Sequence, residues 1–161
     1  SGGGGRVDLG MLARTDQAWI SDNTDAHDRI TIQDGYSRIY PARTMSAWVT
    51  DSPNPFSGRT VPLAFRFHVA MAGVLGIGGN LLNWSEADLS EATELLARYK
   101  SIRHIVQHGV QYRLQAGPIT AVQYVLGSEV VVLAWPSHDQ MAPAVRAFRD
   151  YALQPPRPTL S

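Results

Sequence analysis

The chain has 161 residues, of which 44% are hydrophobic and 17% charged, and its fourteen basic residues balance its fourteen acidic ones. This length fits one domain, or a domain with part of another, and the composition excludes a charge-rich disordered chain. Balanced charge gives no reason to expect nucleic acid or a membrane as partner, and a chain without cysteine has neither a disulfide scaffold nor a thiolate metal site. The longest apolar stretch, residues 61–82, contains Arg66 and His68 and is too polar to span a bilayer.

The first part of the chain alternates between predicted helices and short predicted strands. The glycine-dense residues 1–10 predict no regular element. Residues 24–39 favour a helix with an interrupted apolar stripe, and residues 62–74 favour a helix with proline in its first turn. Short strands are expected at 45–50 and 75–78. This alternation is typical of an α/β fold with a parallel sheet.

Residues 85–108 form the clearest predicted helix. Apolar residues recur at three- and four-residue steps, Ser85 and Asp88 resemble a capping box, and Gly109 is a natural residue just past the C-terminus. After this helix only strand patterns follow, which predicts an antiparallel β unit with strands at 110–114, 120–126 and 130–135. The proline-rich residues 154–161 are expected to form an unstructured tail.

Two short patterns are weak candidates for a ligand site. Four consecutive glycines, residues 2–5, lack the spacing of a phosphate-binding loop and are more typical of a linker. His104 and His108 lie one helical turn apart, but Ile105 stands where a zinc protease has its glutamate. Surface histidines near a helix C-terminus are the simpler interpretation.

The polar residues 21–25, which follow Trp19, form a stronger candidate. Asp25 precedes a predicted helix, whose N-terminus favours an ionised carboxylate, and Asp22 lies in the loop before it. A carboxyl group beside an apolar ring can act as an acid near neutral pH, and tryptophan is suited to hold a sugar ring. An ordinary aspartate cap in a loop explains the same residues, and the local pattern leaves both alternatives open.

The runs SGGGGRVDLGML at residues 1–12 and QAWISDNTDA at residues 17–26 resemble the α-galactosidases of glycoside hydrolase family 36, whose pattern reads approximately CSGGGGRFDLGML…QxWTSDNTDAxxR. The resemblance covers about residues 1–135. It implies the last part, about strands five to eight, of a (β/α)8 TIM barrel, followed by part of an antiparallel β domain. Residues 1–108 would belong to the catalytic barrel and residues 109–153 to a partial C-terminal β domain.

The same resemblance implies a retaining glycosidase that hydrolyses terminal α-1,6-galactosides such as melibiose and raffinose. It assigns Asp22 as the general acid/base, Trp19 as a wall of the galactose pocket, and Gly2 and Gly3 as residues that lie against the sugar. It implies no cofactor and no metal. The substrate is an α-galactoside, a homo-oligomeric parent protein is left open, and the arginine-rich composition without a signal-peptide pattern favours the bacterial cytoplasm.

Several residues depart from the family pattern. The nucleophile of the family lies in a Lys-Trp-Asp run that is absent here, and no cysteine precedes Ser1. Trp48 and the pair Pro55 and Phe56 replace family residues close to the site. The chain by itself is therefore expected to be inactive, as a fragment of the enzyme. Alternatives are an α-N-acetylgalactosaminidase, a galactosyl transferase, or a non-enzymatic sugar-binding remnant of the barrel.

Overall fold

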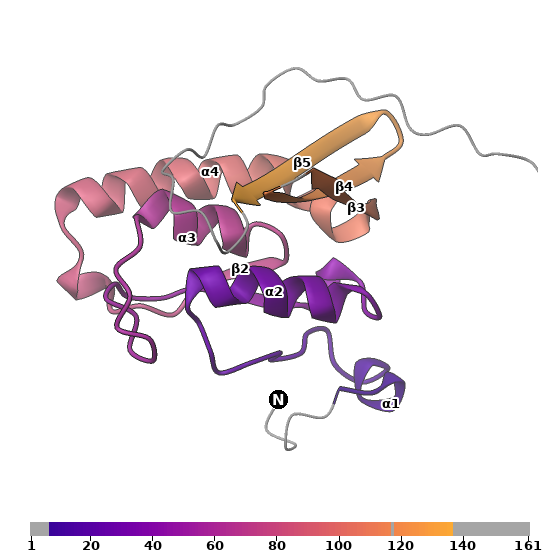
Figure 1. The fold of residues 1–161 in the computed structure, drawn as a ribbon, viewed down its shortest axis with the longest axis horizontal. Coiled ribbons are helices and arrows are strands. Elements are labelled where there is room, and N and C mark those ends of the chain that lie inside the picture. Colours follow the sequence, from indigo (N-terminus) through magenta and orange to yellow (C-terminus); the bar gives the residue numbers. More distant parts are fainter. Residues whose placement is uncertain (1–6, 117, 137–161) are drawn as a thin grey trace, which may run out of the picture.

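The computed structural model describes residues 7–116 and 118–136, which fold as a mixed α/β structure (Figure 1). No helix within these ranges is long and apolar enough to cross a lipid bilayer. The elements, in chain order, are α1 (Leu9–Leu12), α2 (Ala26–Ser37), the 3-10 turn η1 (Ala42–Thr44), β1 (Ser46–Val49), α3 (Leu63–Ala70), β2 (Val74–Ile77), the 3-10 turn η2 (Leu81–Asn83), α4 (Glu86–His108), β3 (Val110–Ala116), β4 (Ile119–Leu126) and β5 (Glu129–Pro136).

A parallel β-α-β unit forms the middle of the molecule. Strands β1 and β2 pair in parallel, from Ser46 opposite Val74 to Val49 opposite Ile77, and α3 connects them. An isolated parallel bridge between Ala18 and Met45 places the preceding extended segment beside β1. The predicted parallel arrangement is therefore confirmed as two strands and one bridge.

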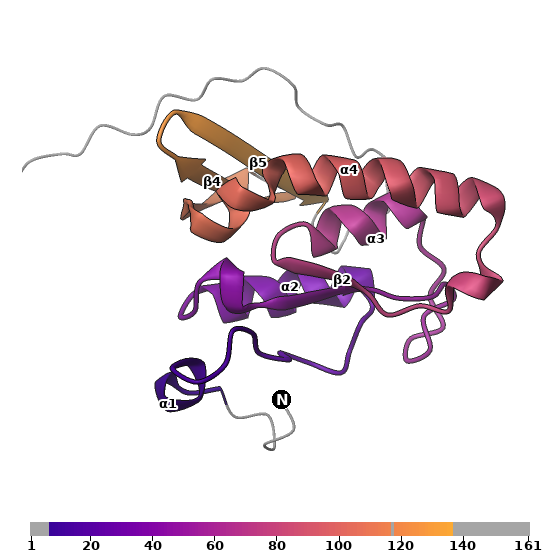
Figure 2. The ribbon, with the colours of Figure 1, turned by 180° about the vertical axis from the view of Figure 1, so that it is seen from behind.

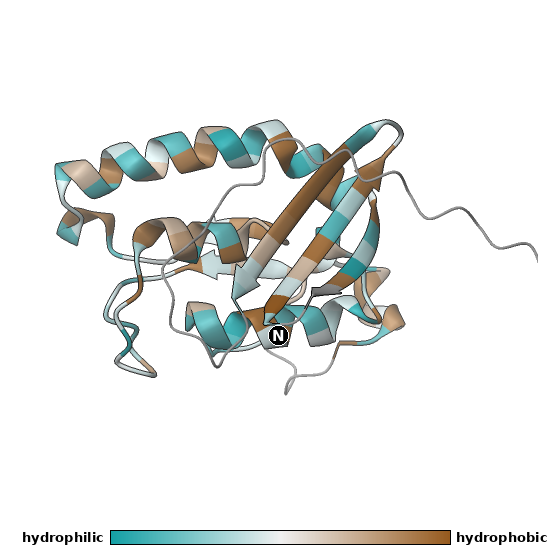
Figure 3. Ribbon diagram, turned by 45° about the horizontal axis from the view of Figure 1, so that its top comes forward, coloured by the Kyte–Doolittle hydropathy of each residue, from teal (hydrophilic) through white to brown (hydrophobic). Residues whose placement is uncertain are grey.

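Helix α4 covers α3 on the side away from α2 (Figure 2). Its capping box is confirmed, because Ser85 Oγ accepts from the Asp88 N–H and Asp88 Oδ2 accepts from the Ser85 N–H, each at 3.1 Å. Polar and apolar bands alternate along the helix (Figure 3), as expected of an amphipathic helix. Its buried Leu95 and Tyr99 share a core cluster with Val49 and Phe67.

Gly109 ends α4 for a different reason than predicted. Its φ is −75°, so the helix does not end in the left-handed conformation that favours glycine. An added Cβ would lie 2.4 Å from the backbone oxygen of Ile105 and 3.0 Å from that of Val125. The glycine is required because the backbone of α4 on one side and that of strand β4 on the other leave no room for a Cβ.

Strands β3, β4 and β5 form an antiparallel sheet that packs on the helices (Figure 1). Val122, Tyr124 and Trp135 of this sheet share one core cluster with Val69 and Val106. The Tyr124 hydroxyl donates to the Ala72 backbone oxygen at 2.8 Å, behind the end of α3. The sheet and the helical layer thus share one hydrophobic core.

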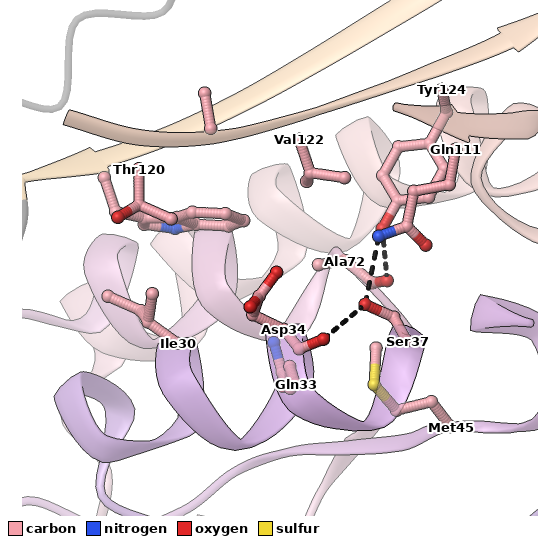
Figure 4. Close-up of a pocket in the computed structure, with 12 residues that line it drawn as sticks. Ile30, Gln33, Asp34, Ser37, Met45, Ala72, Gln111, Thr120, Val122 and Tyr124 are labelled. Carbon is pink, nitrogen blue, oxygen red and sulfur yellow. Dashed lines mark hydrogen bonds between the residues drawn. The ribbon is translucent and has the colours of Figure 1, made fainter. Parts of the chain in front are cut away.

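The interrupted apolar stripe of α2 is explained by polar contacts of its inner face. The Gln33 amide, which is buried, donates to the Val69 backbone oxygen at 2.9 Å. One turn further on, Ser37 Oγ accepts from Gln111 Nε2 at 3.0 Å across a small pocket between α2 and the sheet (Figure 4). Hydrogen bonds at this interface replace part of the apolar contact that a fully amphipathic helix would make.

The strand boundaries differ from prediction by one or two residues, and three differences concern helices. The helix predicted at 62–74 ends at Ala70, since a Cβ at Gly73 would lie 2.7 Å from the Met45 backbone oxygen, and β2 begins directly after this contact. The helix predicted at 24–39 is two residues shorter at each end. The absence of regular structure predicted for residues 1–10 is wrong at Leu9 and Gly10, which begin α1 after Asp8 as N-cap. The tail predicted at 154–161 lies outside the described residues.

Candidate active site

The carboxyl ends of the parallel segments meet at one edge of the small sheet. The Ala18 N–H donates to the Thr44 backbone oxygen at 2.7 Å, and the Ser46 N–H donates to the Ala18 oxygen at 3.2 Å. The residues after Ala18 therefore leave at the same edge as those after Val49 and Ile77, and the hydroxyls of Thr24 and Thr50 meet there at 3.2 Å. In folds with parallel strands this is the edge at which ligands bind.

The polar residues 21–25 form a bonded loop at this edge. Ser21 Oγ accepts from the Asn23 N–H at 3.1 Å, and Asn23 Oδ1 accepts from the Asp25 N–H at 3.0 Å. Thr24 and Asp25 are buried, whereas Asp22 is the exposed member of the run. Its neighbours hold the loop in shape, and Asp22 remains accessible to a ligand.

Asp25 is a structural clamp, and only 1% of it is exposed. Its carboxylate caps α2 by accepting from the N–H groups of His27 (2.9 Å) and Asp28 (3.2 Å), and it also accepts from Ser57 Oγ at 2.5 Å and pairs with Arg59. Burial raises the pKa of Asp25, but these hydrogen bonds and the charge of Arg59 outweigh burial and hold the pKa below its usual value. Asp25 is therefore ionised, as its position before a helix predicted, and its carboxylate oxygens are occupied by hydrogen bonds and the ion pair.

Asp22 is held from one side by an indole. Trp19 Nε1 donates to Asp22 Oδ1 at 2.6 Å, a short hydrogen bond. Trp19 is half-buried and Asp22 is exposed. The structure thus brings together two of the four residues that the resemblance placed at the site, with the carboxyl group oriented by the aromatic ring.

A second tryptophan lies against the first. The ring centroids of Trp19 and Trp48 are 5.2 Å apart, with their planes tilted by 55°. Trp48 comes from the middle of β1 and lies over β2, where a Cβ at Gly76 would approach its ring to 3.3 Å and one at Gly78 to 2.9 Å. Two aromatic rings and a glycine-lined strand therefore form one continuous apolar surface.

A buried arginine ties the Asp22 loop to β1. Arg29, from the inner face of α2, donates to the Ser46 backbone oxygen at 2.7 Å and to the Ser21 oxygen at 3.4 Å. Burial lowers the pKa of Arg29 to about 10, so that the group is still cationic at neutral pH. The residue before Asp22 is thereby fixed to the start of the strand that carries Trp48.

The histidine pair predicted from the sequence is separate from this site, whereas Gly2 and Gly3 lie outside the described residues. His104 is on the far end of α4, where its ring contacts Glu129 at 3.2 Å, and His108 is exposed. In the part of the chain that the structure describes, no group of three or more potential ligand side chains is placed to hold a metal ion.

Two features of the site were not predicted. Trp48 was noted only as a departure from a pattern, although the alternation in β1 could have placed it: Ala47 and Val49 are fully buried on one face, so Trp48 belongs to the other. The clamp from Ser57 and Arg59 to Asp25 spans more than thirty residues of sequence. No local pattern predicts such a contact.

The fold and site define an α/β protein with an acidic side chain and an aromatic surface at the carboxyl edge of its parallel strands. The sequence profile of the Melibiase family matches residues 1–109. The chain therefore belongs to this family, the α-galactosidases of glycoside hydrolase family 36.

Known members of the family are similar over most of the chain. The α-galactosidase Mel36A of Lactobacillus acidophilus is 44% identical over 116 residues, which are 72% of this chain and 16% of the relative. The α-galactosidase AgaA of Geobacillus stearothermophilus, solved with raffinose, matches with a TM-score of 0.77 and 40% identity over 81% of this chain and 19% of that one. The galactosidase domain of the α-galactosidase-sucrose kinase AgaSK matches with a TM-score of 0.82 and 33% identity over 96% of this chain and 22% of that one. The chain thus spans about one sixth of the length of the curated relatives it matches.

Proposed function

We propose that this chain is the segment of a retaining α-galactosidase that carries the general acid/base, Asp22. The observation that carries the proposal is the exposed Asp22 carboxyl group, which the Trp19 indole orients at the carboxyl edge of the parallel strands. Membership of the family and the raffinose complex of AgaA support a terminal α-1,6-galactoside, such as melibiose or raffinose, as substrate. The proposed location of the full-length protein is the bacterial cytoplasm.

The proposed domain organisation follows from the same family. Residues 1–108 are the last part of a (β/α)8 barrel, with the segment ending at Asp22 as strand six, β1 as strand seven and β2 as strand eight. Residues 109–153 begin a C-terminal β domain. The parallel pairing of β1 with β2 and the antiparallel order β3-β4-β5 support this division.

In the proposed mechanism the Asp22 acid protonates the glycosidic oxygen while a second carboxylate, from elsewhere in the full-length protein, attacks the anomeric carbon. The bond to the leaving group breaks and a glycosyl-enzyme ester forms. The Asp22 carboxylate then removes a proton from water, whose oxygen attacks the anomeric carbon and releases galactose and the nucleophile. Trp19 serves as an apolar wall for the sugar, and Gly2 and Gly3 are proposed to lie against the sugar.

The test is the dependence of Asp22→Ala on the leaving group, measured in the full-length protein. On melibiose, whose leaving group needs a proton, kcat/KM, which reports cleavage of the glycosidic bond, should fall by about 10²–10⁴-fold. On an activated aryl α-galactoside, whose aryl group leaves without a proton, kcat/KM should fall far less. The matched control is Asp16→Ala, which removes an exposed carboxylate six residues upstream. Equal losses on both substrates would contradict the acid role.

The chain alone is proposed to be inactive. A retaining glycosidase needs two carboxyl groups about 5–5.5 Å apart. Asp25 does not serve as the second, because it is buried in its clamp with Ser57 and Arg59. The purified 161-residue chain should therefore hydrolyse neither melibiose nor an aryl galactoside, and turnover of either would contradict the assignment.

A further inference from the structure

Trp48 belongs to the face of β1 that looks away from α3. Its neighbours Ala47 and Val49 are fully buried in the cluster that β1 forms with α3 and α4. Since successive side chains of a strand point to opposite faces, Trp48 lies on the other side of the small sheet. Its large ring does not contribute to that core and is half-buried on the face that carries Trp19.

The Trp48 ring packs directly on the backbone of two glycines, Gly76 and Gly78, which together form its glycine floor. Trp48 stands opposite Gly76 in the parallel register, and Gly78 follows directly after the end of β2. A Cβ at Gly76 would lie 3.3 Å from Cε3 and Cζ3 of the indole, and one at Gly78 would lie 2.9 Å from Cε3. Glycine weakens a strand, and in this position it commonly marks close approach of another group, which here is the indole ring.

From this floor a chain of contacts leads to Asp22. The Trp48 ring meets the Trp19 ring at a centroid distance of 5.2 Å, within the range of a favourable tilted aromatic pair. The Trp19 indole N–H in turn holds Asp22 Oδ1 at 2.6 Å. A shift of Trp48 therefore displaces the ring whose N–H orients the carboxyl group.

We propose that Trp48, supported by Gly76 and Gly78, is a positioning residue that sets the place of the Trp19 indole and through it the direction of the Asp22 carboxyl group. The proposal rests on the proposed galactosidase function for its catalytic consequence, but its geometric content stands on the contacts alone. Trp48 acts through Trp19 and transfers no proton itself.

The experiment perturbs the ring from two sides in the full-length protein. Trp48→Ala removes the ring that supports Trp19. Gly78→Ala keeps the Trp48 ring but pushes it away from the backbone of Gly78. With two variants, the test does not depend on the folding of either one. Trp135→Phe is the control for the loss of a buried tryptophan, since Trp135 belongs to the other core cluster. Gly35→Ala is the control for glycine replacement, because nothing lies within 4 Å of a Cβ at that position.

Both test variants should lower kcat/KM on melibiose by roughly tenfold or more and lower kcat/KM on an activated aryl galactoside much less, because kcat/KM reports cleavage of the glycosidic bond and misplacement of the acid matters most where the leaving group needs a proton. The two controls should leave the ratio of the two kcat/KM values unchanged. A loss of equal size on both substrates would indicate a merely structural role and overturn the proposal.

Crystal structures of the two variants test the geometry without any substrate. The expected result is a Trp19 ring displaced by about 1 Å or more, with its N–H no longer on Asp22 Oδ1. A Trp19–Asp22 hydrogen bond that stays in place in both variants would overturn the proposal. If the parent protein hydrolyses no galactoside, the proposed function fails, and the variant structures still decide whether Trp48 positions Trp19.

Discussion

Two aspartates only three residues apart serve opposite purposes in this structure. Asp25 is 1% exposed and is held by two backbone N–H groups, Ser57 and Arg59, whereas Asp22 is exposed and is bonded to the indole N–H of Trp19. The buried carboxylate has its bonding capacity filled by the fold, and the exposed one is oriented without being enclosed. Within one polar motif, Asp25 thus stabilises the loop, whereas Asp22 is left accessible to a ligand.

The largest expected effects separate these two purposes. Asp25→Ala should lower the free energy of opening of α2 by about 3 kcal/mol, because it removes a helix cap and leaves buried donors without an acceptor. Asp22→Ala should change the same quantity by less than about 0.5 kcal/mol, as expected of an exposed side chain. Amide hydrogen exchange of α2 in the full-length protein measures both. Similar values for the two variants would remove the distinction.

Acid should weaken the Asp25 clamp. The pKa of Asp25 in the folded protein lies below the ordinary value of 3.8, so its ionised form is favoured by folding. The stability that it contributes is fully present above pH 3.8 and is lost as the pH falls through the lower, folded-state pKa. Asp34, whose pKa is also lowered although burial opposes Arg38 and Arg113, contributes with the same sign. In Asp25→Asn the acid-induced opening of α2 should be shallower, and an unchanged profile would contradict this account.

A smaller effect is expected at the far side of the clamp. Ser57→Ala removes one hydrogen bond to the Asp25 carboxylate and should lower the stability of α2 by about 1–2 kcal/mol, less than loss of the carboxylate itself. Ser101→Ala is a suitable control, since that exposed hydroxyl donates to the Arg98 backbone oxygen within its own helix. Thermal unfolding midpoints of the two variants can be compared directly, and an equal shift would argue that Ser57 contributes nothing particular.

The smallest effect is expected where α2 meets the antiparallel sheet. Arg113 of β3 pairs with Asp34 at 2.8 Å, but both side chains are about one-third exposed, and solvent screens such pairs. Arg113→Met should therefore lower the stability of the full-length protein by about 0.5 kcal/mol, and more at low salt than at high salt. A loss comparable to that of Asp25→Ala would show that the interface depends on this pair.

The sequence predicted most elements because local signals agreed with the packing. The capping box at Ser85 and Asp88, the apolar period of α4 and the three β-branched runs after Gly109 needed no tertiary information. The end of α3 and the need for Gly73 and Gly109 could not be predicted, since a Cβ at Gly73 would meet the backbone oxygen of Met45 and one at Gly109 would meet those of Ile105 and Val125, contacts that exist only in the folded chain.

The candidate site shows the same division. Trp19 and Asp22 lie three residues apart in one loop, so a motif could bring them together. Trp48 and its glycine floor come from two further strands, and their contact with Trp19 exists only once β1 and β2 are paired. A sequence motif was therefore enough to identify the Asp22 carboxyl group, whereas the residues that support it from β1 and β2 could be found only in the fold.

The central claim is that Asp22 is the general acid/base, and the reaction of Asp22→Ala with azide tests it most directly. With an activated aryl α-galactoside the variant should accumulate its glycosyl-enzyme, which azide attacks without needing a proton removed. The account predicts that azide raises the rate and that the product is α-galactosyl azide, with retained configuration. Formation of β-galactosyl azide, which would make Asp22 the nucleophile, or melibiose hydrolysis by the variant at the parent rate, would contradict the claim.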